Sequence, residues 1–417
     1  MCSKIFYLVI FICLLCNISY SQEHLSYFYK NYFLNLENLQ KINIADGRPV
    51  FDENMKYLFI YDPGYREVTV FSKENTLKIT SFRTEGTNKP LIDEQYLISS
   101  DKENFYIYDF TGKKVFTLPC RTEIEKDKYF YSQIVILKDD IFLTMPDNGL
   151  EIINMKTKKE ITPENKEKSM EQDINGRNLL FAINDGVLYI KDLDGKHGII
   201  VYKYNGNGKV LFKTSIEHTD IEIKGDLHYY HRYLNYFTHN NNYLIFTTGV
   251  FEKKYNVTRI VELKRGEVTE AKLIVSGILT DEKENLTGLL SLNDKKDILT
   301  LYDGNGKTKK WDYEFPGHIY CETTSALSYG NILAVAYYCR ISTGSNLMAL
   351  DINTGKLLWN ADVVQLMIPH SKYYNTVTLD RYKDKILMAG YESGGTYLQV
   401  FDINSGKRLY EDTDKTW

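Results

Sequence analysis

Short runs of β-branched and aromatic residues, separated by polar turns, follow one another along most of the chain. Residues 397–401 (YLQVF) form one such run, and residues 402–407 (DINSGK) form the turn that follows it. Strands favour β-branched and aromatic side chains, whereas Asp and Asn favour turns and Gly reaches the positive φ that tight turns need. Apolar residues do not recur at the three- and four-residue spacing of a helix. The pattern therefore predicts an all-β chain built from hairpins.

Seven hairpins repeat one pattern, in which a β-rich run leads through a polar turn, usually with Gly, and a Lys or Glu into a second β-rich run. They read NFYIYDFTGKKVFTL, GLEIINMKTKKEIT, GIIVYKYNGNGKVLFKT, TRIVELKRGEVTEAKL, DILTLYDGNGKTKKWDYE, NLMALDINTGKLLWNADV and YLQVFDINSGKRLYED. Their turns are centred on Gly112, Thr157, Gly208, Gly266, Gly306, Gly355 and Gly406. The centres lie about 49 residues apart on average, which is the length of a four-stranded unit with its turns.

Two further strands precede such hairpins. Residues 375–380 and 385–392 precede the last one, and residues 178–184 and 186–192 precede the third. Four strands in this order form an antiparallel meander, which buries its faces by stacking on its neighbours and, in a ring, leaves few free edges. We therefore expect a β-propeller of four-stranded antiparallel blades, because a pair of stacked sandwiches would not explain the sustained period.

The N-terminal part of the chain holds a variant of the unit. Residues 47–52, 56–72 and 75–82 predict an eighth four-stranded sheet, so eight blades are favoured over seven. Residues 22–42 are expected to form a separate N-terminal segment, either a short amphipathic helix or a strand that helps to seal the ring. The propeller domain is expected over residues 43–417.

The first 21 residues have the three parts of a secretory signal peptide. Lys4 supplies the positive charge, residues 5–16 (IFYLVIFICLLC) form the apolar run, and Ser19 and Ser21 precede the expected cleavage site. Twelve helical residues span roughly 18 Å, which is too short for a bilayer core of about 30 Å. We therefore expect cleavage after residue 21 and a mature protein that is secreted, periplasmic or otherwise in the cell envelope.

The charge balance argues against nucleic acid as a partner. The chain has 55 Asp and Glu against 51 Lys and Arg, for a formal charge of −4, so it lacks the basic surplus that attracts phosphate backbones. The apolar fraction of 43% and the charged fraction of 25% are ordinary for a globular protein. No second long apolar run follows the signal peptide, and we expect a soluble monomer without a transmembrane segment.

Three cysteines remain once the signal peptide is removed, namely Cys120, Cys321 and Cys339. The residues on either side of Tyr329 and Gly330 predict a tight hairpin, in which Cys321 and Cys339 lie almost opposite each other. A cross-strand disulfide between these two cysteines is one expectation. The alternative is a pair of buried thiols that pack as small apolar side chains.

Residues 348–359 (MALDINTGKLLW) closely resemble the repeat of the pyrroloquinoline-quinone-like (PQQ-like) β-propellers, which reads roughly A-x-D-x-x-T-G-K-x-x-W. Residues 401–407 match less fully, with Tyr410 where the repeat has Trp, and residues 108–113 are also similar. The resemblance is specific in the last two units and loose elsewhere. It implies a structural role, capping a turn, allowing its backbone or wedging between blades, for Asp351, Gly355, Trp359, Asp402 and Gly406.

The same resemblance argues against a bound quinone. Quinoprotein dehydrogenases of this family stack the cofactor on a Trp platform, bind Ca²⁺ with Glu, Asn and Asp, and use an Asp as base, and many carry a disulfide between adjacent cysteines. This chain has no Cys-Cys pair, and Trp311 and Trp359 lie in or beside the repeat position while Trp417 is the last residue. We therefore expect a member of the family that is not a quinoprotein, without a cofactor and without a metal site.

The longest interval of the repeat holds a polar insertion, residues 221–242, which is the best binding candidate by position. Propeller loops that vary in length often serve binding, and Tyr and Arg are common anchors of interfaces. The expected binding residues are Tyr229, Tyr230, His231, Arg232 and Tyr233. A loop that only covers a blade edge is the alternative. His228 and His231 would lie on opposite faces of a strand, so they do not predict a metal site.

The chain lacks the motifs of common catalytic sites, including G-x-S-x-G and H-E-x-x-H. We therefore expect an exported, non-catalytic binding or scaffold module for a protein, peptide or glycan at the cell envelope. The alternative is a carbohydrate-active hydrolase or lyase that uses acids at the central channel. A third hypothesis is a role like that of the outer-membrane assembly propellers. Those are lipoproteins, and Leu15 stands before Cys16 where their signals have a small residue.

Overall fold

The computed structural model describes most of the chain in 19 segments. They are residues 26–29, 32–43, 50–53, 57–62, 64–72, 77–88, 90–92, 95–119, 134–145, 149–164, 179–192, 198–217, 234–250, 255–281, 283–293, 295–315, 321–339, 344–366 and 376–415. These segments contain only strands, turns and irregular connections. Within them, no helix is long and apolar enough to span a membrane.

The chain divides into two compact units, and the bounds of the expected propeller domain, residues 43–417, stay a prediction. One unit comprises residues 24–219, and the other includes residues 220–417. In both, strands that follow one another within a sheet pair antiparallel.

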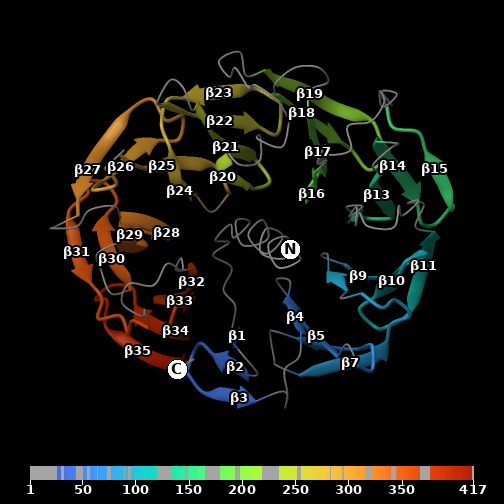
Figure 1. Ribbon diagram of the computed structural model, residues 1–417, viewed down its shortest axis with the longest axis horizontal. Helices are drawn as coiled ribbons and strands as arrows, with labels where there is room; N and C mark the ends of the chain where they lie inside the picture. The colour runs from blue at the N-terminus through green and yellow to red at the C-terminus, as the bar shows by residue number, and fades with distance from the viewer. Residues whose placement is uncertain are drawn as a thin grey trace. The chain divides into compact units, whose positions relative to one another are not determined.

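The unit of residues 24–219 contains one three-stranded sheet and four four-stranded sheets among its described residues (Figure 1). The three-stranded sheet comprises β1 (Ser26–Tyr29), β2 (Tyr32–Asn35) and β3 (Lys41–Asn43). The four-stranded sheets comprise β4 (Val50–Glu53), β5 (Tyr57–Asp62), β6 (Glu67–Ser72) and β7 (Lys78–Arg83); β8 (Leu91–Ile92), β9 (Tyr96–Ser100), β10 (Asn104–Asp109) and β11 (Lys114–Pro119); β12 (Ile134–Leu137), β13 (Asp140–Met145), β14 (Gly149–Asn154) and β15 (Lys159–Ile161); and β16 (Leu179–Ile183), β17 (Gly186–Asp192), β18 (Gly198–Tyr204) and β19 (Val210–Glu217).

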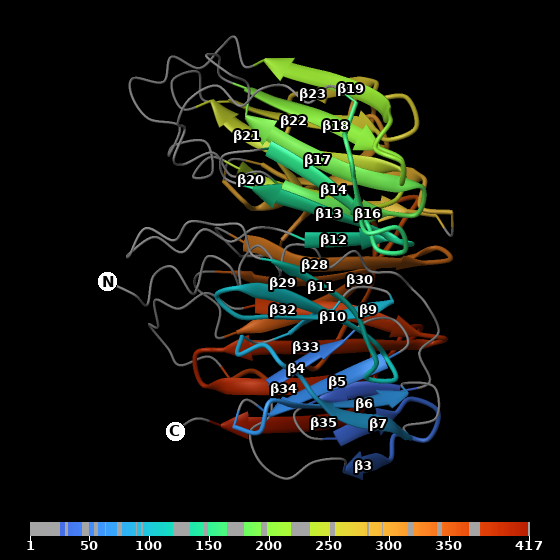
Figure 2. The ribbon, with the colours of Figure 1, turned by 90° about the vertical axis from the view of Figure 1, so that its right-hand side faces the viewer.

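The unit with residues 220–417 has four four-stranded sheets in its described part, and the strands of the last one, within residues 376–415, lie side by side in Figure 2. They comprise β20 (Leu234–His239), β21 (Tyr243–Val250), β22 (Tyr255–Glu262) and β23 (Val268–Ala271); β24 (Val275–Thr280), β25 (Leu286–Leu292), β26 (Ile298–Asp303) and β27 (Lys309–Glu314); β28 (Cys321–Tyr329), β29 (Ile332–Cys339), β30 (Ser345–Asp351) and β31 (Leu357–Asn360); and β32 (Thr376–Tyr382), β33 (Lys385–Glu392), β34 (Gly395–Asp402) and β35 (Arg408–Lys415).

Successive sheets pack face to face in chain order within each unit. In the second unit, Leu290 and Leu301 of one sheet pack with Val335 and Met348 of the next. In the first unit, a cluster around Val70 joins β4–β7 to β8–β11, and further clusters continue through β12–β15 to β16–β19. Stacked four-stranded meanders are the blades of a β-propeller. The predicted all-β propeller fold is therefore confirmed, while the number of blades stays a prediction.

The turn between the third and fourth strands of the repeat has a shared geometry. In the last two sheets of the chain, Asp351 Oδ1 and Asp402 Oδ1 each accept hydrogen bonds from two backbone N–H groups and one hydroxyl. Gly355 and Gly406 close these turns at φ of +71° and +69°. In the turn predicted around Thr157, the positive φ of 57° belongs to the next residue, Lys158. Glycine was therefore a reliable marker of this turn, and its absence shifted the expected position by one residue.

The turn glycines also lie against rings of the preceding sheet. A Cβ on Gly355 would come within 2.7 Å of the Trp311 ring, and a Cβ on Gly406 within 2.5 Å of the Trp359 ring. The two indole N–H groups donate to carbonyl oxygens of the next sheet, Trp311 to Ile352 at 2.8 Å and Trp359 to Ile403 at 3.1 Å. These tryptophans therefore link consecutive sheets.

Residues 26–29 and 32–43 form a three-stranded sheet rather than a helix, and β3 ends one residue beyond the expected boundary at residue 42. Its β2–β3 turn has the repeat geometry, because Leu39 N donates to Asn35 O at 2.8 Å and Leu39 has a φ of 58°. Phe33 is fully buried and packs against Phe71 of β6. The N-terminal segment therefore forms a three-stranded version of the repeated sheet.

The predicted hairpin around Gly330 is present in the second unit. β28 pairs with β29, and the register places Cys321 directly opposite Cys339. Cys339 is disulfide-bonded. These two observations agree with the expected cross-strand pair, and the identity of the partner cysteine stays a prediction.

Candidate functional site

The expected binding residues Tyr229, Tyr230, His231, Arg232 and Tyr233 lie outside the described residues, as do His218 and His228. The insertion is described only from residue 234 onward. Its role in binding stays a prediction.

The end of the insertion has a structural role. Asn241 donates to the Glu284 carboxylate from its backbone N at 2.9 Å and from its side-chain Nδ2 at 3.0 Å. Asn242 Nδ2 donates to the Lys283 carbonyl oxygen at 2.8 Å. His239, at the end of β20, is mostly buried, and burial lowers its pKa from 6.5 to about 4. This Asn-rich turn therefore joins two adjacent sheets.

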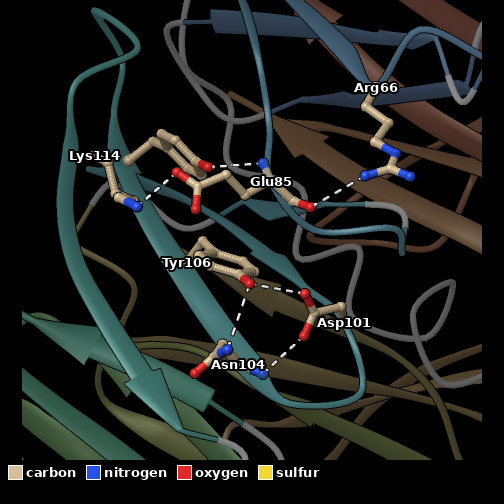
Figure 3. Close-up of polar contacts among 7 residues, drawn as sticks. Arg66, Glu85, Asp101, Asn104, Tyr106 and Lys114 are labelled. Atoms are coloured by element: carbon tan, nitrogen blue, oxygen red, sulfur yellow. Dashed lines mark hydrogen bonds and ion pairs between the residues drawn. The ribbon is translucent and has the colours of Figure 1, made fainter.

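A polar cluster with exposed members lies where the sheets β4–β7 and β8–β11 meet, in the unit of residues 24–219 (Figure 3). We call it the Tyr106 cluster. Its members come from the β5–β6 turn, the β7–β8 connection, the β9–β10 turn, β10 and β11. They are Arg66, Glu85, Asp101, Asn104, Tyr106 and Lys114, together with Tyr108, which contacts Glu85.

Asp101 organises one side of the cluster. Its Oδ1 accepts the backbone N–H groups of Glu103 and Asn104, both at 2.8 Å. Its Oδ2 accepts the Tyr106 hydroxyl at 2.8 Å, as Figure 3 shows. Asn104 Nδ2 donates in turn to the Tyr106 hydroxyl oxygen at 3.4 Å. The turn before β10 thus fixes the position of the tyrosine.

Glu85 organises the other side. Its backbone N donates to the Tyr108 hydroxyl oxygen at 2.9 Å, and its carboxylate accepts Lys114 Nζ at 2.6 Å. The Lys114 ammonium also lies 5.7 Å from the centre of the Tyr106 ring, within range of a cation–π interaction. The connection between the two sheets is therefore held by both β10 and β11.

Arg66 projects from the β5–β6 turn, which a carboxylate and a hydroxyl hold in place. Asp62 Oδ1 accepts the backbone N–H groups of Gly64 at 2.8 Å and Tyr65 at 3.2 Å. The Arg66 carbonyl oxygen accepts Thr84 N at 2.8 Å and Thr84 Oγ1 at 3.3 Å. Arg66 has a φ of +54°, and Tyr65 beside it is 67% exposed. The turn therefore presents an aromatic ring and a guanidinium on a fixed backbone.

The charges of the cluster follow from these contacts. Burial raises the pKa of Asp101, but hydrogen bonds from Glu103, Tyr106 and Asn104 and the nearby Arg66 outweigh it, so this pKa lies below its usual value. The hydrogen bond to Asp101 raises the pKa of Tyr106, and burial adds to the rise. The hydrogen bond to Glu85 raises the pKa of Lys114. At neutral pH the cluster therefore combines an ionised Asp101, a protonated Lys114 and a neutral Tyr106.

Aromatic side chains and arginine at a surface are typical of protein interfaces. Among the described residues, no group of three or more His, Cys, Asp or Glu side chains could hold a metal ion. The cluster could not be predicted from the sequence, because its members come from separated segments and form no motif. The only local signals were Asp62-Pro63-Gly64 and Asp101, which are typical of turns.

No family model and no curated protein sequence matches the chain. Among solved structures, the chain is similar to BamB from Moraxella catarrhalis, with 11% identity, a TM-score of 0.46, and 84% of this chain and 95% of BamB covered. It is similar to apo AztD from Citrobacter koseri, with 10% identity, a TM-score of 0.42 and coverage of 85% and 94%. It is also similar to the dihydro-heme d1 dehydrogenase NirN, with 12% identity, a TM-score of 0.47 and coverage of 89% and 76%. Similarities of this size assign no activity or ligand to the chain.

Proposed function

We propose that this protein is an exported, non-catalytic β-propeller that binds a protein partner at the cell envelope, and that the Tyr106 cluster with Tyr65 forms a contact surface. The observation that carries the proposal is the β5–β6 turn, which presents an exposed Tyr65 and Arg66 on a backbone held by Asp62 and Thr84. A rigid aromatic and an arginine supply contact area at a small entropic cost on binding.

We also propose that the chain is a PQQ-like propeller without the quinone. The support is the repeat around Asp351 and Gly355, together with the packing of Trp311 and Trp359 against the next sheet. The alternative of a carbohydrate-active hydrolase or lyase has no observation here that favours it. The residues 229–233 are proposed as a second contact surface on the strength of their composition.

A photo-crosslinking experiment tests the binding proposal. Full-length protein with p-benzoylphenylalanine in place of Tyr65 is expected to give a specific crosslinked product in cells of the source organism, because a bound partner covers this exposed position. The matched control places the same crosslinker at Tyr391, which is 44% exposed and belongs to the other unit. The Arg66→Gln substitution should reduce the Tyr65 product severalfold. Equal products from both positions, or no product from Tyr65, would contradict the proposal.

A further inference from the structure

The carboxylates of the Tyr106 cluster already accept hydrogen bonds, whereas its guanidinium has spare donors. Asp101 accepts three hydrogen bonds, and Glu85 accepts a short one from Lys114. Arg66 makes one side-chain hydrogen bond within the described part of the chain, from Nη1 to the Glu85 carbonyl oxygen at 3.5 Å. An arginine carries five N–H donors, and a distance of 3.5 Å marks a weak bond. The unused hydrogen-bonding capacity of Arg66 is therefore donor capacity.

Asp101 does not use up the charge of Arg66. The guanidinium is near enough to help lower the pKa of Asp101, yet the Asp101 oxygens are taken by their own turn and by Tyr106. The guanidinium is planar, and its paired N–H groups match the two oxygens of a carboxylate. An incoming carboxylate could bind Arg66 without breaking an existing hydrogen bond of an acid in the cluster.

We infer that the partner presents an Asp or Glu side chain to Arg66, within an extended peptide segment that also contacts the Tyr65 ring. This inference rests on the proposed function, since it names the chemistry of the partner at the same surface. The fixed β5–β6 turn holds the backbone from which the Arg66 side chain projects, so binding does not have to order the turn as well as the side chain. A single acidic residue is thus read by geometry as well as by charge.

Selection of peptides on the full-length protein tests this inference. A phage-displayed library of linear peptides is selected on the wild type, with counter-selection on the Arg66→Gln variant, and recovered peptides are measured by calorimetry. We expect recovered peptides to carry Asp or Glu, and conversion of that residue to Asn or Gln to weaken binding by about tenfold or more. Arg66→Lys should weaken binding severalfold because an ammonium lacks the planar pair of donors.

The matched control is Lys102→Gln, which removes an exposed charge from the neighbouring β9–β10 turn. It should change affinity by less than about twofold, since an exposed charge without a fixed geometry contributes little. Arg66 is exposed, so its variants should keep the wild-type melting temperature. If the melting temperature of a variant changes, the substitutions in the peptide decide the test instead.

The outcomes separate this inference from the proposed function. Peptides that bind at Tyr65 but keep their affinity after loss of the acid, or bind Arg66→Gln equally well, would overturn the acidic-peptide inference and leave the binding surface in place. Tri-galacturonic acid, a glycan that carries carboxylates, is tested in parallel. If it binds and no peptide is recovered, the carboxylate belongs to a glycan and the inference of an acidic peptide is wrong. Absence of every ligand together with absence of a Tyr65 crosslink would overturn both proposals.

Discussion

Single oxygen atoms hold the turns of the repeat. Hydrogen bonds from Thr354 and Asn353 lower the pKa of Asp351, and those from Ser405 and Asn404 lower the pKa of Asp402. Each carboxylate therefore stays ionised well into the acid range. The sequence could predict these residues because the turn chemistry is local, lying within five positions of the chain. His239 differs, since its lowered pKa comes from burial in the fold rather than from neighbours in the chain.

Burial of His239 should make the protein less stable in mild acid. Its pKa is about 4 in the folded chain against an ordinary 6.5, so between these values the unfolded chain binds a proton that the folded chain does not. Stability is therefore lost as the pH falls from 6.5 towards 4, by up to about 3 kcal/mol. Urea unfolding at pH 7 and pH 5 should show a smaller loss for His239→Gln than for the wild type. An equal loss in both proteins would show that His239 is protonated in the folded state.

At the scale of elements, an aromatic ring on the fourth strand of one sheet packs against a glycine of the next sheet, in the turn between its third and fourth strands. Trp311 lies against Gly355, Trp359 against Gly406, and in the other unit Phe82 lies against Gly112. Each of these glycines has a positive φ as well, so two independent constraints exclude a side chain. The turn and the packing of the sheets therefore depend on the same residue.

Gly406→Ala should destabilise the protein more than Gly330→Ala. Both residues have positive φ, at 69° and 53°, so alanine costs about 1 kcal/mol at either site. A Cβ at residue 406 would overlap the Trp359 ring, whereas nothing lies within 4 Å of a Cβ at residue 330. Overpacking adds about 1–3 kcal/mol at residue 406, to be measured by urea unfolding. Similar losses at both sites, or no relief of the Gly406→Ala loss in a Trp359→Ala background, would refute the steric account.

Some of the strands could be predicted from the sequence and others could not. Hairpins marked by glycine were predicted closely, and β17 (Gly186–Asp192) and β33 (Lys385–Glu392) have the expected limits. For the N-terminal segment the sequence left a helix and a strand open, because its turn uses Asn35 and a positive φ at Leu39 without any glycine. The Tyr106 cluster depends on two sheets packing together, and a contact of that kind leaves no spacing in the sequence.

At the scale of the whole molecule, the two units share one construction. Each contains four four-stranded sheets in its described part, stacked in chain order. Residues 1–25 lie outside the described residues, so export is a proposal that rests on the signal-like sequence.

Mass spectrometry of protein purified from the source organism should find a mature chain that starts at Gln22. Ser19 and Ser21 place small side chains where signal peptidase needs them. The control is Ser21→Phe, which blocks the expected site and should leave the precursor uncleaved. A chain that begins at Met1, or one that carries a lipid on Cys16, would reject cleavage after Ser21.

The contact between a turn glycine and the aromatic ring of the preceding sheet also constrains how the gene for this protein can change in length. The ring and the glycine lie 44 residues apart in the chain for Trp311 and Gly355, and 47 apart for Trp359 and Gly406. In both cases they belong to different copies of the repeat. A duplication or excision of one full period gives every ring a glycine again, whereas a cut of half a period leaves a ring facing a side chain. Growth and shrinkage of the gene should therefore proceed in steps of whole units, and chimaeras between related proteins should be joined at equivalent points of the period.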